Sequence, residues 1–161
     1  MDNSYELIEA KLCHIPQLAI HHRMMFEEIW QNRSMTINDD IGNEIQNAYA
    51  EKLENEMPSG MCVPWGFVDN GRIVASGAIT IVSFVPVPLD LSSRVAYLHS
   101  MFTEKKYRKG GLAGSIVKRA VEHCKKAGVK RIFLNASDAG KRLYENMGFV
   151  SSPETMRLLV D

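Results

Sequence analysis

One stretch of the chain decides the fold: Tyr107-Arg108-Lys109-Gly110-Gly111-Leu112-Ala113-Gly114. It follows a strand-like run from Val95 to Thr103 and opens a helix-like run that continues to about Lys126. The apolar positions of that run recur at helical spacing, at Leu112, Ile116, Val117, Ala120 and Cys124. Glycines let the backbone approach a ligand closely, and the first N–H groups of a helix carry about half a positive charge. The stretch therefore predicts a turn that binds a pyrophosphate.

The turn differs from the commoner nucleotide-binding turns. It lacks the Gly-Lys-Ser/Thr ending of a Walker A loop and the G-x-G-x-x-G spacing of dinucleotide folds, which makes ATP and NAD the weaker ligands. The alternative interpretation is an ordinary tight turn into a helix, with a solvated basic face at Lys105, Lys106 and Lys109.

Helices and strands are predicted on both sides of the turn. Tyr5 to Ala10 is typical of an edge strand, and Pro16 suits the first turn of a helix that runs to about Trp30. A second helix follows the capping residues Asn38 to Asp40 and ends before Pro58. The first half of the chain is therefore expected to hold one strand and two helices before a β-rich segment.

That β-rich segment runs from Met61 to Val82, with a hairpin turn at Asp69-Asn70-Gly71. Prolines make Phe84 to Ser93 a loop, which we expect to border a substrate pocket. After the glycine-containing turn and its helix, a strand is predicted from Arg131 to Asn135. A helix opened by Ser137 or Asp138 and ended by Gly148 follows, and a final strand begins at Phe149.

Composition limits the classes of partner. A chain of 161 residues with 45% hydrophobic residues fits one domain, residues 1–161. Nineteen basic and nineteen acidic residues give no field that would attract nucleic acid or an anionic membrane. The cysteines, Cys13, Cys62 and Cys124, have no disulfide or metal spacing, and no leader or membrane-spanning run is seen. We therefore expect reduced thiols and a cytoplasmic protein.

Three residues of the turn resemble a family signature. Arg108, Gly111 and Ala113 occupy the defining positions of the Arg/Gln-x-x-Gly-x-Gly/Ala motif of GNAT superfamily acetyltransferases. Downstream, the run Gly140 to Phe149 is similar to the family's helix after the fifth strand, including the recurrent Tyr-x-x-x-Gly-Phe that begins at Tyr144. The resemblance covers essentially the whole chain. It implies an α/β (α+β) fold with a mixed, mostly antiparallel sheet of six to seven strands, about four helices, and splayed strands four and five.

The resemblance also implies acetyl-CoA as cosubstrate and no metal. The pantetheine arm is expected between the splayed strands, and main-chain N–H groups of the turn are expected to hold the pyrophosphate, so that side-chain substitution at Lys109 costs little. The positions assigned in this way to coenzyme binding are Ser100, Met101, Phe102, Thr103, Arg108, Lys109, Gly110, Gly111, Leu112, Ala113, Gly114, Asn135 and Ser137.

The implied reaction is direct attack of a primary amine on the thioester, with an N–H near Met101 stabilising the oxyanion. Tyr144 is expected to act as general acid to the leaving thiolate; the alternative is a tyrosine that only packs the last helix on the sheet. The glutamate that some members carry on strand four is replaced here by Tyr97, His99 and Ser100. His99 is therefore the nearest candidate for the base, ahead of Glu27 and Glu28 on the first helix.

Two other classes of function remain open. One is a non-catalytic regulatory module that binds acetyl-CoA through the same turn. The other is a nucleic-acid module that uses Lys105, Lys106, Arg108 and Lys109, which lack interleaved aromatic residues. The histidines His14, His21 and His22 lack the spacing of metal ligands.

The expected partner is a small-molecule or peptide amine, with neither nucleic acid nor membrane. Acceptor specificity is expected to lie in the first two helices and in the loop Phe84 to Ser93. Their sequences match no particular amine. A homodimer through the apolar run Met156 to Val160 is a further expectation from the resemblance.

Overall fold

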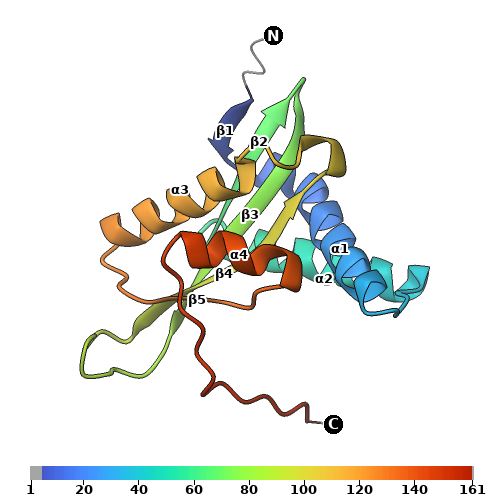
Figure 1. Cartoon of the computed structure of the whole chain (residues 1–161). Helices are drawn as coiled ribbons and strands as arrows, with labels where there is room; N and C mark the ends of the chain where they lie inside the picture. Colours follow the sequence, from blue (N-terminus) through green and yellow to red (C-terminus); the bar gives the residue numbers. More distant parts are fainter. Residues whose placement is uncertain (1–4, 161) are drawn as a thin grey trace.

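A single five-stranded sheet forms the centre of the molecule (Figure 1). The computed structural model describes residues 5–160. The strands lie in chain order: β1 (Glu6–Glu9), β2 (Cys62–Asp69), β3 (Arg72–Ser83), β4 (Arg94–Thr103) and β5 (Ile132–Leu134). Neighbours pair antiparallel except β4 and β5, which are parallel. The predicted mixed, mostly antiparallel sheet is confirmed, but the predicted six to seven strands are wrong.

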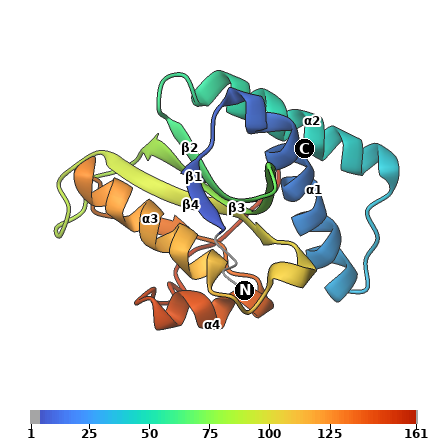
Figure 2. The ribbon, with the colours of Figure 1, turned by 90° about the horizontal axis from the view of Figure 1, so that it is seen from above.

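Helices cover both faces of the sheet (Figure 2). They are α1 (Ile15–Asn32), α2 (Asp39–Glu56), α3 (Leu112–Lys126) and α4 (Asp138–Asn146), with short 3-10 turns η1 (Leu12–His14) and η2 (Lys105–Tyr107). The pair α1 and α2 lies on one face, whereas α3 and α4 lie on the other. None of the helices in the described part of the chain is both long enough and apolar enough to cross a bilayer.

Local sequence explains most element boundaries. Pro16 stands in the first turn of α1, and the side chain of Asn38 accepts a hydrogen bond from the N–H of Ile41 at 2.9 Å, which caps α2. Asn70 and Gly71 both have positive φ, 49° and 76°, as a tight turn between twisted strands requires. The predicted helices and hairpin are therefore confirmed, with ends shifted by a few residues.

Two apolar clusters sandwich the sheet. Under α3, Trp65, Ile116 and Val117 are fully buried, together with Cys124 on the predicted inner stripe. Under α1 and α2, the second cluster is centred on Leu53, which is likewise fully buried. Because β3 is buried on both faces along most of its length, the centre of the sheet is a rigid support for the residues at its edges.

The predicted final strand from Phe149 is wrong for the described residues. After Gly148, with φ of 93°, the chain runs without secondary structure to Val160. This segment leaves the body of the molecule (Figure 1), and Val150 is 88% exposed. An apolar run becomes a strand only where a neighbouring edge pairs with it, and no described strand lies beside this one.

Candidate active site

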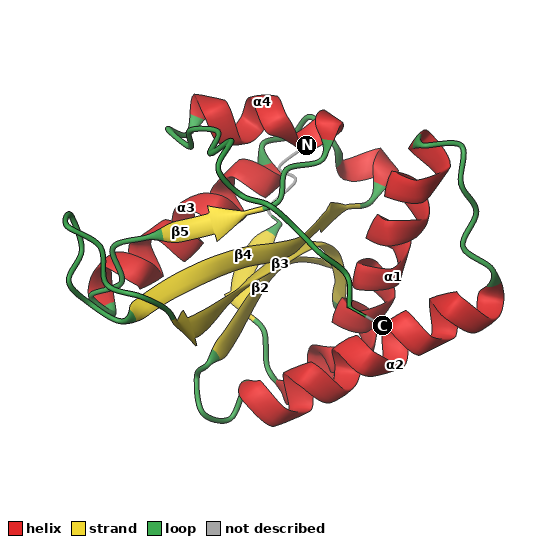
Figure 3. Ribbon diagram, turned by 90° about the horizontal axis from the view of Figure 1, so that it is seen from below, coloured by secondary structure: helices red, strands yellow, loops and turns green. Residues whose placement is uncertain are grey.

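Strands β4 and β5 separate halfway along β4. Their parallel pairing joins Ala96 to Ile132 and Leu98 to Leu134, and it ends there. β4 continues to Thr103, paired with β3 alone among the described strands. Residues 99–103 therefore present a free backbone edge on the β5 side (Figure 3), as the predicted separation of these strands requires.

A β-bulge interrupts β4 at this point. Ser76 pairs with Phe102 and Ala78 with His99, so that Ser100 and Met101 together face Gly77. Ser100 has a φ of 57°, in the left-handed region. A bulge leaves backbone groups outside the regular ladder, and here it lies at the free edge.

The bulge turns its two residues toward opposite faces of the sheet. The Ser100 hydroxyl lies 2.8 Å from Nδ1 of His22 on α1. Met101 instead points to the α3 face, where a Cβ built on Gly77 would come within 2.1 Å of its sulfur and 3.1 Å of Ile116. Gly77 therefore leaves the space that the Met101 side chain occupies.

The turn before α3 is held by a contact with the β2–β3 hairpin. It also presents backbone N–H groups that are free to bind a ligand. The Tyr107 hydroxyl donates a 2.6 Å hydrogen bond to Asp69 of the β2–β3 hairpin. Lys109 and Gly111 have positive φ, 65° and 78°, and Gly111 caps α3 without a side chain. The N–H groups of residues 112–114 have no acceptor among the described residues. Such a helix start fits a phosphate or pyrophosphate.

Arg108 holds the turn in place. Its guanidinium makes two hydrogen bonds to the Glu28 carboxylate, at 2.7 and 2.6 Å, and Nε donates to the Thr103 carbonyl at 2.8 Å. The guanidinium lowers the pKa of Glu28. Arg108 thus ties α1 and the end of β4 to the turn, with its charge neutralised by Glu28. Glu27 is engaged similarly by Arg23, at 2.6 Å, so both glutamates are ion-paired.

Tyr144 lies on α4, on the α3 face of the sheet. It is buried in the same apolar cluster that Met101 packs against, and its ring meets Phe149 at a centroid distance of 5.8 Å. α4 approaches the start of α3, where Leu143 lies near Gly114. The Tyr144 hydroxyl makes no hydrogen bond to a described residue; since no fully buried polar side-chain atom in the described residues lacks a partner, solvent reaches this hydroxyl. Burial of the side chain raises its pKa.

Asn135 and Ser137, which were assigned to coenzyme binding from the sequence, follow β5, on the side opposite β4 where the two strands separate. Asn135 is exposed directly after the last paired residue, Leu134. The Ser137 hydroxyl accepts a hydrogen bond from the N–H of Gly140 at 3.2 Å and so caps α4. The cap gives the Ser137 side chain a structural role, one that the sequence also predicts.

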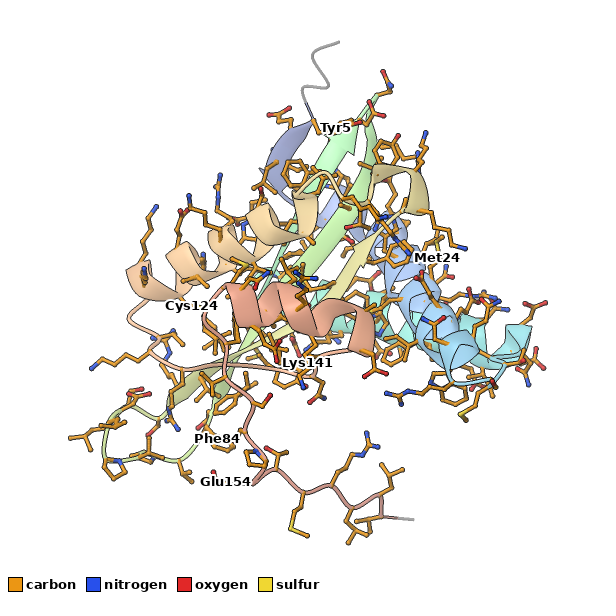
Figure 4. The ribbon with its side chains drawn as sticks, in the orientation of Figure 1. Tyr5, Met24, Phe84, Cys124, Lys141 and Glu154 are labelled. Atoms are coloured by element: carbon orange, nitrogen blue, oxygen red, sulfur yellow. The ribbon has the colours of Figure 1, made fainter. Side chains whose placement is uncertain are left out.

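A cavity of about 640 Å³ opens on the opposite face, between α1, α2, β3 and β4. His99 lines it, as do Tyr97 and Thr80. Val82 also lines it, but no residue of 84–93 does, so the prediction that this loop borders the pocket is wrong for this cavity. Phe84 instead packs on Phe133 of β5, at the far end of the sheet (Figure 4).

Hydrogen bonds join the polar residues of the cavity into a chain. His99 Nε2 lies 2.8 Å from the Thr80 hydroxyl, and its Nδ1 lies 2.8 Å from the Ser100 hydroxyl, which also contacts His22. The His22 ring stacks on Tyr49 at a centroid distance of 3.9 Å. A neutral imidazole donates at one nitrogen and accepts at the other, so the chain can pass a proton along its length.

Burial keeps both imidazoles neutral near pH 7. Desolvation lowers the pKa of His99 to about 3 and that of His22 to about 4. The sequence did not single out His22 for this site. The only signal for it was a histidine on a helix with an apolar inner side, beside the buried His21, which does not indicate the partner on β4.

A comparison with protein-family models identifies the class of protein that has this fold. Residues 18–149 match the model of the acetyltransferase (GNAT) family, and the chain belongs to this family, as its motifs predict. A comparison with curated proteins finds no match.

Solved structures share the whole fold. A predicted acetyltransferase with acetyl-CoA from Clostridium acetobutylicum is 24% identical, with 96% of each chain covered and a TM-score of 0.85. A GCN5-related N-acetyltransferase from Ralstonia eutropha is 18% identical, with 97% of this chain and 99% of that chain covered and the same TM-score of 0.85. Glucosamine-6-phosphate N-acetyltransferase from Arabidopsis thaliana is 16% identical, covers 99% and 100%, and has a TM-score of 0.72. Membership of the family supports acetyl transfer in general.

Proposed function

We propose that this protein transfers the acetyl group of acetyl-CoA to a primary amine of a small-molecule or peptide acceptor by direct attack. The observation that carries the proposal is the position of the break between β4 and β5. It lies between the cavity that His99 lines on one face and the cluster that holds Tyr144 on the other. Donor and acceptor would meet there from opposite faces of the sheet.

The residues around the break fit the coenzyme. The free N–H groups of residues 112–114 match a pyrophosphate, and the free edge of residues 99–103 matches an extended amide-containing arm. When bound, the coenzyme supplies an activated thioester carbonyl. An N–H beside Met101 at the bulge would stabilise negative charge that develops on the carbonyl oxygen.

Tyr144 is proposed to protonate the departing thiolate. Its hydroxyl makes no hydrogen bond to a described residue, and its raised pKa keeps it protonated near pH 7. Positioned acids contribute about 10²–10⁴-fold to rate. Tyr144→Phe should therefore lower kcat by about 100-fold while the Kd for acetyl-CoA, from calorimetry, stays within about twofold. An unchanged kcat would assign Tyr144 to packing alone.

Proton removal from the acceptor is proposed to start at His22 and continue to His99. Both ring nitrogens of His99 already contact hydroxyls, whereas His22 Nε2 has no partner in the described part of the chain. An alkylammonium with a pKa of about 10 must lose a proton before it attacks. His22 Nε2 would accept it as His22 Nδ1 passes its own proton to Ser100, Ser100 passes one to His99 Nδ1, and His99 Nε2 passes one to Thr80, whose hydroxyl proton leaves to solvent in the cavity, so that neither imidazole stays charged.

The alternative function is a regulatory module that binds acetyl-CoA without turnover. Release of coenzyme A thiol in the presence of a broad amine panel separates the two. Amine-dependent release that Tyr144→Phe suppresses supports the enzyme. Tight acetyl-CoA binding without release for any amine would support the module.

A homodimer through the C-terminal segment is also proposed. Met156, Leu158, Leu159 and Val160 are each more than 80% exposed, an unusual run of exposed apolar side chains. The outer edge of β5 has no described partner strand. Light scattering should give a dimer mass for the full chain and a monomer mass after truncation at residue 150; a full-length monomer would refute the proposal.

A further inference from the structure

The cavity beside β4 has a distinctive charge pattern, which bears on the acceptor of the proposed acetyl transfer. Its lining contains no aspartate or glutamate. Lys52 is its one permanently charged lining residue, and desolvation keeps His22 and His99 neutral. An acceptor that carried a second ammonium group, besides its reacting amine, would lose the water around that group without gaining an anion, which is costly.

Lys52 does not offer a free positive charge in return. Its ammonium group pairs with Glu56 one turn later on α2, and both side chains are at least two-thirds buried. A carboxylate on the acceptor could use Lys52 only by competing with Glu56. The cavity therefore presents no unpaired charge of either sign.

The walls are aromatic and aliphatic. Phe26 and Trp30 come from α1, Tyr49 and Ile45 from α2, and Tyr97 from β4. The Tyr49 ring is stacked on His22 and meets His99 edge-on at 5.9 Å, so the inner wall is a fixed aromatic surface. Such rings bind flat or branched apolar groups and also tolerate one ammonium over their faces.

We infer that the acceptor is an apolar monoamine, with an aryl or alkyl body that fills the cavity and a single basic nitrogen at its inner end near His22. Diamines, polyamines, aminosugars and amino acids with a free carboxylate are disfavoured. The inference rests on the proposed acetyl transfer and adds the class of acceptor to it.

Two matched pairs of amines test the inference. Pentylamine and 1,5-diaminopentane differ only in the second ammonium, and 2-phenylethylamine and phenylalanine differ only in the carboxylate. In thiol-release kinetics, kcat/KM should favour the apolar monoamine of each pair by about 100-fold, within the range that one buried group supplies. A ratio near one, or a reversed ratio, overturns the inference.

Tryptophan fluorescence gives a readout that does not depend on turnover. The chain has two tryptophans: Trp30 lines the cavity, and Trp65 is fully buried under α3. In the presence of coenzyme A, pentylamine and 2-phenylethylamine should change the emission, and Trp30→Phe should abolish the response. No response to either monoamine overturns the acceptor class. Binding without any acetylation would instead count against the proposed function.

A charge placed in the cavity should weaken the preference for the monoamine. Ala48 lines the cavity but is exposed on α2, so Ala48→Glu is compatible with folding. This variant should raise kcat/KM for 1,5-diaminopentane by about fivefold or more relative to pentylamine. Asn47→Glu is the matched control, because Asn47 is exposed on the same helix and lines another depression. Equal effects of the two variants would overturn the inference.

Discussion

Replacing Gly77 by alanine tests whether the bulge in β4 depends on the space left opposite it. The new Cβ would stand 2.1 Å from the Met101 sulfur and 3.1 Å from Ile116 Cγ2. Met101 can rotate away, but Ile116 is fully buried and can move only by repacking the α3 core. Added methyl groups in a packed core cost about 1–3 kcal/mol. We expect that loss in the free energy of unfolding, or about 2–4 °C in Tm per kcal/mol.

A double-mutant cycle with Met101→Ala isolates the contact. The sulfur is the atom nearest the added methyl, so Gly77→Ala should cost less in the Met101→Ala background. We expect a favourable coupling of about 1–2 kcal/mol between the two substitutions, measured by urea unfolding. Acetyl-CoA titration of Gly77→Ala should show weaker binding, because movement of Met101 displaces the free edge of β4.

Additivity of the two substitutions would refute the reasoning. If Gly77→Ala unfolds within about 0.5 kcal/mol of the parent and shows no coupling to Met101→Ala, the bulge does not depend on the absent side chain. Loss of stability with unchanged acetyl-CoA affinity would separate the packing from the coenzyme site.

Three further predictions concern the turn, the histidines and the ion pair. Gly111→Glu should weaken acetyl-CoA binding by about 100-fold in calorimetry, through a strained φ and charge repulsion, whereas Lys109→Asn, which tolerates its φ of 65°, should change it little. Because the folded-state pKa values of His22 and His99 are lowered to about 4 and about 3, the unfolded chain binds more protons below about pH 6.5. Urea unfolding should therefore show stability falling from pH 6.5 to 4, and less so in His99→Gln. Glu28→Gln should cost no more than about 1 kcal/mol, since the pair is one-third exposed, and 1 M salt should shrink the difference.

Features encoded within a short stretch were predictable from the sequence. The turn before α3 is marked by its glycines, and the helix that follows by the spacing of its buried residues; both are confirmed. The position of Tyr144 followed from a motif of a few residues. Its place on α4, beside the start of α3, agrees with that motif, while its role stays a prediction.

Features that depend on distant contacts were not predictable. Arg108 was assigned to coenzyme binding from its motif, but the partner of its side chain, Glu28, lies 80 residues away in the chain. No spacing rule connects those two positions. The relation of His22 to Ser100 likewise spans 78 residues and depends on a bulge that adjacent residues do not signal.

The final strand was predicted from the sequence but does not form in the described residues. The sequence from Phe149 carries apolar residues that suit a strand, but strand formation requires an aligned neighbouring edge, and pattern alone does not supply one. β5 is only three residues long and offers little edge to pair with. The apolar side chains that were expected to form this final strand are instead exposed in the described tail.

The β-bulge in β4 determines which side chains of this strand lie on each face of the sheet. In a regular strand, Ser100 and His99 would point to opposite faces, but the extra residue turns both toward α1 and sends Met101 to α3. The hydroxyl that links the two histidines therefore lies on the face of the sheet that carries the cavity, which His22 and His99 line. The next residue faces the cluster that holds Tyr144. Since the bulge is backed by Gly77 in a strand buried on both faces, this arrangement is fixed before any ligand arrives.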